Sequence, residues 1–210
     1  MARAFALLAA STLALLTPTG AGGGSDAQRS GAQARQIRTL SLEFVGQFQN
    51  SPPGVTPPTH SHYGYLSYVG GLTAFSGAAE NETTALFTFY ADAATPRVIA
   101  DGPLRIITRV GLLTIYRDGS PDGDFTKPES FRDGTPVLVA RFRQQVVSDT
   151  VTGSFTTFHQ NRIVSTRRFP ARRGNVELGQ IGATFRTFFS GHVTMPGPPS
   201  GVFGGYAVSG

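Results

Sequence analysis

The chain contains no cysteine, so its fold has to be stable without disulfide bonds. Any cross-link that supplements the packing of the core would have to come from a bound metal ion. With 210 residues, of which 40% are apolar and 16 are phenylalanine, the chain can fill one ordinary core. Phenylalanine is expected to supply much of the volume of that core.

The sequence also lacks an apolar run long enough to cross a bilayer whose hydrocarbon core is roughly 30 Å thick. The longest such run extends only from Ala4 to Leu16. Because Arg3 precedes this run and small residues follow it, the pattern predicts a signal peptide over residues 1–21. We therefore expect a secreted protein, extracellular or periplasmic, with no membrane span.

The segment after the predicted signal peptide is low in hydrophobicity and rich in glycine, serine and glutamine. Such a composition cannot bury enough surface to offset the entropy of ordering the chain. Residues 22–36 are therefore predicted to be a flexible linker, and residues 37–210 to form a single β-barrel domain.

Helical periodicity and internal repeats are absent from the body of the chain, which consists of short β-branched and aromatic segments separated by turn residues. Asp149 and Gly153 favour a hairpin turn between two of these segments. One segment alternates between an apolar face (Leu138, Ala140, Phe142 and Val146) and a polar face (Arg141, Arg143 and Gln145). We expect an all-β fold, an antiparallel β-barrel of the calycin or allene-oxide-cyclase-like kind, with a β-sandwich as the alternative.

One stretch, ENETTALFTFYADAATPRVIADGPLRI, resembles the barrels of the allene oxide cyclase and dirigent superfamily. In those proteins an aromatic strand of the FxFY kind precedes a short strand and a Gly-Pro step, matched here by Phe87, Phe89, Tyr90, Gly102 and Pro103. The resemblance implies a β-barrel that binds a small lipophilic molecule and, if it is an enzyme, acts as a cyclase or isomerase. It assigns no active-site residue to this chain.

Polar residues inside aromatic segments are the candidates for lining a ligand pocket: Tyr65, Gln144, His159 and Asn161. Such groups can orient or polarise a carbonyl in a mostly apolar pocket; the alternative is that they face solvent. His60 and His62 share one face of a strand, which suits either a transition-metal pair or exposed edge-strand histidines. The absence of a G-x-S-x-G elbow argues against an ordinary hydrolase.

Arginine outnumbers lysine 17 to one, and five arginines cluster in NRIVSTRRFPARRG: Arg162, Arg167, Arg168, Arg172 and Arg173. Guanidinium clusters can bind phosphate or sulfate in a bidentate manner. The alternative function is therefore a non-catalytic extracellular module that binds an anionic polymer through an arginine-rich edge. Alternatively, the arginines have no ligand and belong to a solvated strand end. Nucleic acid is not an expected partner.

The stretch DGSPDGDFTKPE places oxygen-bearing residues at the spacing of an EF-hand calcium loop. The predicted ligands are Asp118, Ser120, Asp122, Asp124, Thr126 and Glu129, with Gly123 at the sharp turn. No helical flanks are predicted around it. The loop is thus either a calcium site or a polar turn between two strands.

Overall fold

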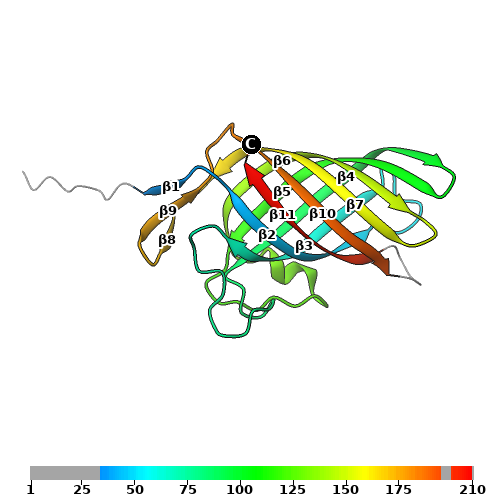
Figure 1. The fold of residues 1–210 in the computed structure, drawn as a ribbon. Coiled ribbons are helices and arrows are strands. Elements are labelled where there is room, and N and C mark those ends of the chain that lie inside the picture. The colour runs from blue at the N-terminus through cyan, green and yellow to red at the C-terminus, as the bar shows by residue number, and fades with distance from the viewer. Residues whose placement is uncertain (1–33, 195–199, 210) are drawn as a thin grey trace, which may run out of the picture. The chain divides into compact units, whose positions relative to one another are not determined.

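A computed structural model describes residues 34–194 and 200–209 of the chain (Figure 1). Eight strands form a closed barrel in the order β10-β11-β2-β3-β4-β5-β6-β7, and every neighbouring pair is antiparallel. The predicted all-β antiparallel barrel is therefore confirmed, and the sandwich alternative is not adopted. The barrel strands are β2 (Ser41–Asn50), β3 (Thr59–Val69), β4 (Phe87–Asp101), β5 (Leu104–Arg117), β6 (Thr135–Asp149), β7 (Ser154–Thr166), β10 (Thr184–Thr194) and β11 (Ser200–Ser209).

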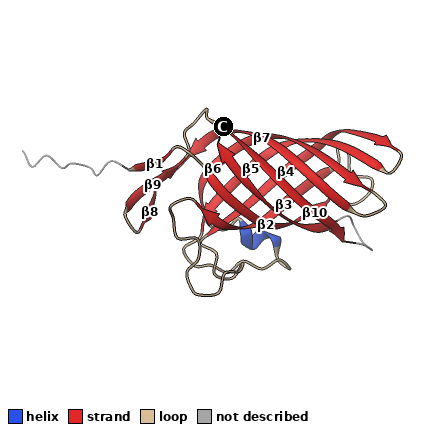
Figure 2. Cartoon of the chain, in the orientation of Figure 1, coloured by secondary structure: helices blue, strands red, loops and turns tan. Residues whose placement is uncertain are grey.

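A smaller sheet of three short strands lies at one end of the barrel (Figure 2). It consists of β1 (Arg35–Ile37), β9 (Gly174–Leu178) and β8 (Phe169–Ala171), with β1 parallel to β9. Phe169, Val176 and Leu178 are buried in the same apolar cluster as the barrel interior. The small sheet therefore extends the barrel core at that end.

The predicted signal peptide and residues 22–33 of the predicted linker lie outside the described residues. Arg35 and Gln36, at the end of that linker, belong to β1. Within the described part of the chain, no helix is both long and apolar enough to cross a membrane.

Strand alternation decides which side chains enter the barrel. On β6, Leu138, Ala140, Phe142 and Val146 are buried while Arg141, Arg143 and Gln145 are exposed or half-exposed, so the predicted faces are confirmed. Four phenylalanine rings meet in the middle of the barrel, with centroid separations of 4.6 to 6.2 Å: Phe44, Phe89, Phe189 and Phe203. The middle of the barrel is therefore filled rather than hollow.

The long connection between β5 and β6 packs on the outside of the barrel and contains the 3₁₀ helix η1 (Pro128–Phe131) (Figure 2). Phe131 from η1 is fully buried against Tyr63 and Phe125, at ring separations of 5.8 and 4.9 Å. This outer aromatic cluster, which also includes Tyr90, fixes the loop to β3 and β4. The loop is thus a folded part of the molecule, with its own small core.

Candidate binding site in the barrel interior

One end of the barrel interior contains buried polar side chains among the phenylalanine rings. His60 and His62 from β3 are 2% and 4% exposed, and His159 from β7 is 3% exposed. Both β3 histidines face inward, as the spacing of two residues predicts, but they are buried rather than exposed at an edge. Arg109 from β5 is 7% exposed and lies beside them. A buried cation and three buried imidazoles in an apolar barrel require a specific explanation.

A cavity of about 250 Å³ borders His60, His62 and Arg109. Its apolar wall comes from five strands, and its polar side contains two histidines, an arginine, an asparagine and two hydroxyl groups. The lining residues are Phe48, Asn50, His60, His62, Ile107, Arg109, Val146, Ser148, Phe155, Thr157 and Val193. A mostly apolar wall with a few convergent polar groups is typical of a small-molecule site.

The hydrogen bonds fix the tautomers of the histidine pair. Asn50 Oδ1 accepts from Arg109 Nη2 at 3.1 Å, so the Nδ1 of His60, 2.6 Å from the same oxygen, carries a hydrogen and donates it. In the neutral ring, His60 Nε2 is then an acceptor, and Arg109 Nη1 donates to it at 3.2 Å. His62 Nε2, 2.5 Å from His60 Nε2, must therefore carry the hydrogen of that contact.

The histidines are held neutral by their surroundings. Burial, followed by the charges of neighbouring histidines and of Arg109, lowers the pKa of His60 and His62 well below the ordinary value. Burial and Arg109 lower the pKa of His159 to about 3. Burial also lowers the pKa of Arg109 to about 10, which leaves the guanidinium charged at neutral pH. The site therefore contains one positive charge and three neutral imidazoles.

Arg109 has no acidic counterpart in the part of the chain that the structure describes. Its three nitrogens donate to His60, Asn50 and Thr95, all of them neutral acceptors. Among residues 34–194 and 200–209, no carboxylate forms a salt bridge with it. Because a buried charge is costly unless it is paired, this guanidinium favours an anionic or strongly polar oxygen in the adjoining cavity.

Three of the four predicted pocket residues lie inside the barrel, but none of the four lines the cavity beside Arg109. Gln144 and His159 are direct cross-strand partners on β6 and β7, and Asn161 is two residues further along β7. Asn161 Nδ2 donates to Thr187 Oγ1 at 2.8 Å and to the Phe185 carbonyl at 3.2 Å, which ties β7 to β10. Both polar atoms of Gln144 and both ring nitrogens of His159 are buried without a hydrogen-bond partner in the described structure.

Tyr65 does not share this interior. It lies on the outer face of β3, with Phe75 and Phe125 at ring separations of 6.1 and 6.3 Å. Burial, followed by the charge of Glu82, raises the pKa of its hydroxyl. Its position follows from alternation, because an odd-numbered residue of β3 faces out where His60 and His62 face in.

Arg109 and Asn50 are the residues that sequence reasoning missed. Arg109 occupies an inward position on β5, in step with Leu113 and Ile115, and could have been found from that alternation. Asn50 ends β2 in step with the buried Phe44 and Phe48, so the same alternation could have indicated it.

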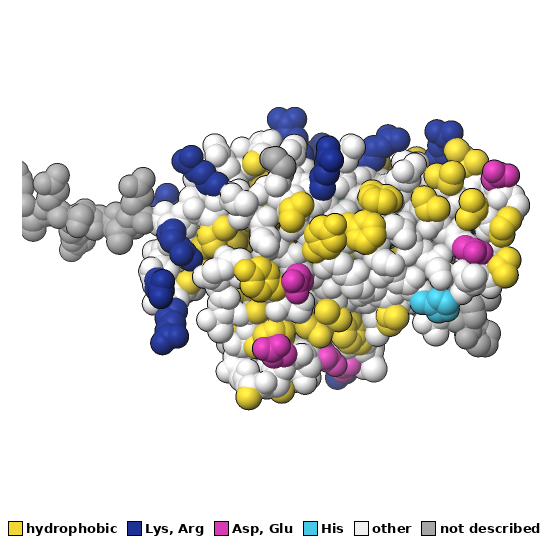
Figure 3. Space-filling model, viewed as in Figure 1, with side chains coloured by type: hydrophobic (Ala, Val, Ile, Leu, Met, Phe, Trp, Pro, Cys, Tyr) yellow, Lys and Arg dark blue, Asp and Glu magenta, His cyan; other side chains and the backbone are white. Residues whose placement is uncertain are grey.

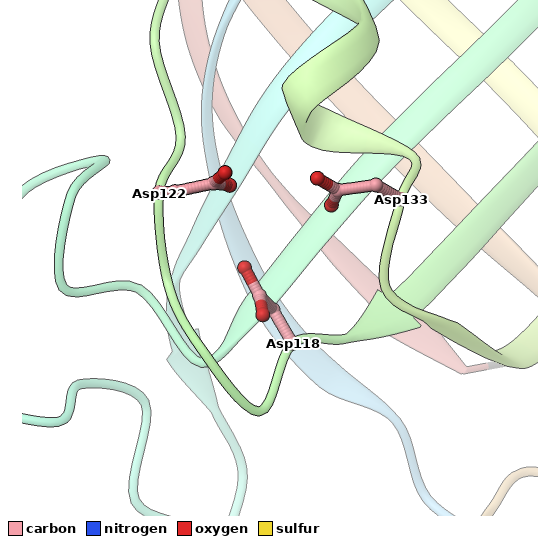
Figure 4. A group of neighbouring side chains, drawn as sticks. All are labelled: Asp118, Asp122 and Asp133. Carbon is pink, nitrogen blue, oxygen red and sulfur yellow. The ribbon is translucent and has the colours of Figure 1, made fainter.

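The predicted calcium ligands separate into two groups. Asp118 and Asp122 lie together with Asp133, which was not among the predicted ligands (Figure 4). Asp124 instead accepts hydrogen bonds from Thr126 and pairs with Lys127 at 3.3 Å, while Glu129 pairs with Arg132 at 2.5 Å. Ser120 contributes its backbone N–H to Asp118 Oδ1 at 2.8 Å. The six residues therefore do not form an EF-hand ring.

The five predicted polyanion arginines are also divided. Arg172 and Arg173 line a groove of about 500 Å³ together with Arg35 and Arg117. Arg162 lies elsewhere, on the outer face of β7, in a depression shared with Arg143 and Arg186. Arg168 pairs with Glu177 at 3.6 Å, and the backbone N–H of Arg167 donates to the Val137 carbonyl. The arginine run thus does not form one continuous edge.

Comparisons of the chain with protein-family models, with curated proteins and with solved structures found no match. The function therefore has to be argued from the chemistry of these sites.

Proposed function

We propose that the chain binds a small, mainly apolar molecule in the barrel interior and that Arg109 holds an anionic or carbonyl oxygen of that molecule. The observation that carries this proposal is the buried guanidinium, which has no carboxylate partner among the described residues and faces a cavity whose other walls are mostly apolar. The volume of about 250 Å³ suits a compact molecule. From the apolar run near the N-terminus, we propose that the protein acts after export.

The same arrangement supports the cyclase or isomerase activity implied by the resemblance to allene oxide cyclases. Arg109 would stabilise negative charge that develops on a substrate oxygen in a water-poor site. Neutral His60 and His62 could relay a proton, because their Nε2 atoms are 2.5 Å apart. Their lowered pKa values keep both rings neutral but also make them weak bases, so they would suit hydrogen bonding to a substrate oxygen better than net removal of a proton.

Binding of octanoate tests the role of Arg109, with 1-octanol as an uncharged probe of similar length. We expect calorimetry to detect octanoate binding to the wild-type protein, and Arg109→Gln to weaken it about 10- to 100-fold. The loss corresponds to one charge-assisted hydrogen bond, roughly 1.5–3 kcal/mol. Octanol binding should change much less.

Arg105→Gln is the matched control, because Arg105 lies on the same strand and donates only to the carbonyls of Gly102 and Leu104. It should bind octanoate like the wild type. Equal octanoate affinity in the wild type and in Arg109→Gln would refute the proposed anchor. Native mass spectrometry of the purified protein would identify a co-purifying acid directly.

A second candidate function is binding of an anionic polymer on the outer face of β6, β7 and β10. Arg141 is directly opposite Arg162 in the β6–β7 register, and Arg143, Arg162 and Arg186 line one depression of about 370 Å³. Like charges placed opposite each other on a sheet destabilise it unless an anion lies between them. None of these four arginines forms a salt bridge within the described ranges.

A further inference from the structure

Three carboxylates converge where the β5–β6 loop leaves and rejoins the barrel. Asp118 follows directly after β5, and Asp133 lies two residues before β6. Asp122 comes from the loop between them. One oxygen of each carboxylate lies within 4.8 Å of the others, and Figure 4 shows the three side chains pointing toward a common space. The cluster therefore joins the two ends of the loop.

Asp118 supplies an independent sign that this space holds a ligand. Its side chain is 6% exposed, and its Oδ1 accepts the backbone N–H of Ser120. Its Oδ2 is buried and has no hydrogen-bond partner among the described residues. An unpartnered buried carboxylate oxygen is costly, and here it belongs to a side chain directed at two further carboxylates.

Within the described ranges, no basic side chain forms a salt bridge with the three carboxylates. Lys127 pairs with Asp124, and Arg132 pairs with Glu129 and Asp92. Arg117 donates to the backbone carbonyls of Leu86 and Asp118 rather than to a carboxylate.

We infer that Asp118, Asp122 and Asp133 bind a divalent cation, and that calcium is the ion that suits them. The ligand set contains only oxygen, which favours a hard cation over zinc or copper. Calcium accepts six to eight oxygen ligands in an irregular shell, whereas magnesium requires a near-ideal octahedron and gives up its waters reluctantly. Three carboxylates that come from separate parts of a loop suit the less demanding ion.

The bound ion would act on the fold rather than on the barrel interior. By linking Asp118 to Asp133 it would close the loop at its base and hold Phe131 against Tyr63. In a chain without cysteine, such a site takes the place of a covalent cross-link. This inference is independent of the ligand proposed for the barrel.

Thermal unfolding of the full chain in calcium and in chelator tests the site. At calcium about 100-fold above the dissociation constant, the melting temperature should rise by roughly 5–10 °C. Asp133→Asn should abolish the rise and should melt in chelator no lower than the wild type, because it removes repulsion among the carboxylates. Magnesium should produce a smaller rise than calcium.

Glu129→Gln is the matched control, because Glu129 belongs to the EF-hand pattern but pairs with Arg132. It should keep the full calcium response. If Asp133→Asn does not fold, the exposed Asp122→Asn replaces it with the same expectation. The site is refuted if the wild type melts identically in both buffers and calorimetry finds no binding at millimolar calcium. It is also refuted if Glu129→Gln loses the response while Asp133→Asn keeps it.

Discussion

The three buried histidines occupy inward positions on β3 and β7, where each side chain is at most 4% exposed. His159 lies between the rings of Phe142, Phe189 and His62, at separations of 5.1, 5.0 and 5.8 Å. Such an apolar setting disfavours the protonated ring, and the charge of Arg109 adds to the effect. At neutral pH the imidazoles therefore leave Arg109 as the single positive charge of the site.

This arrangement makes the stability of the protein depend on pH. In the unfolded chain a histidine binds a proton below about pH 6.5, whereas folded His159 binds one only near pH 3. Between these values the unfolded state binds more protons, so the free energy of unfolding falls as the pH is lowered. Each such histidine contributes a slope of up to about 1.4 kcal/mol per pH unit.

Urea denaturation between pH 7 and pH 4 measures that slope. Carboxylates titrate in part of the same range, so the wild type is best compared with His159→Gln, which retains every carboxylate. In the variant, the free energy of unfolding should depend less steeply on pH, by up to about 1.4 kcal/mol per pH unit, which corresponds to one proton. This difference in slope is expected whatever the absolute stability of the variant. Identical slopes would mean that His159 is not buried in its neutral form.

At the level of the strand, alternation was the most informative feature of the sequence. It assigned the faces of β6 correctly, and the hairpin predicted from Asp149 and Gly153 is present, with Gly153 at a φ of 73° and its N–H donating to the Asp149 carbonyl. Gln144, His159 and Asn161, chosen as polar residues inside aromatic segments, lie inside the barrel. Tyr65 was expected in the same pocket, but it lies an odd number of residues from His60 and His62 and therefore faces outward.

Features that depend on distant parts of the chain could not be found this way. The EF-hand pattern covers only twelve consecutive residues, 118–129. Asp133 lies beyond that stretch, and the chain brings it back to Asp118 and Asp122 only after η1. Similarly, the contact between Arg109 and His60 depends on how β3, β4 and β5 lie side by side in the closed barrel. The alternation of residues along a strand predicts which side chains face inward, but the closure of the barrel decides which of these side chains contact one another.

Strand β11 contains two adjacent glycines with opposite roles. A Cβ at Gly205 would lie 2.0 Å from the Phe188 carbonyl oxygen and 2.6 Å from Phe189 Cδ1. A Cβ at Gly204 would meet only the Phe44 carbonyl oxygen, at an ordinary 3.6 Å. Gly205 therefore makes room for the backbone of β10 and for a core ring, while Gly204 does not.

Alanine substitutions separate the two positions. Gly205→Ala should destabilise the protein by about 1–3 kcal/mol, because the neighbouring strand and ring would have to shift. Gly204→Ala should change the free energy of unfolding by less than about 1 kcal/mol, in either direction. Urea midpoints measure both, and equal midpoints for the two variants would contradict the packing described for β11.

Over the whole molecule, charge is distributed unevenly. The formal net charge is +5, and Figure 3 shows basic side chains gathered along the upper side and left end of this view, with acidic ones mainly along its lower and right sides. The outer arginines of β6, β7 and β10 and the groove lined by Arg172 and Arg173 are two separate basic surfaces. Long-range electrostatic attraction would bring a polyanion to either basic surface. Short-range contacts must therefore decide which of the two surfaces binds it.

Dextran sulfate provides a defined probe for that choice. The triple variant Arg143→Gln, Arg162→Gln, Arg186→Gln removes the guanidinium groups around the β6–β7–β10 depression while leaving the barrel interior unchanged. Exposed ion pairs each contribute up to about 1 kcal/mol, so the variant should bind roughly tenfold more weakly. The difference should shrink as salt is added, since screening weakens exposed charge pairs first.

The comparison variant Arg172→Gln, Arg173→Gln tests the other surface and should retain most of the affinity. A larger loss in this double variant would place the polymer in the groove beside the small sheet, and unchanged affinity in both variants would exclude a specific polyanion site on either surface.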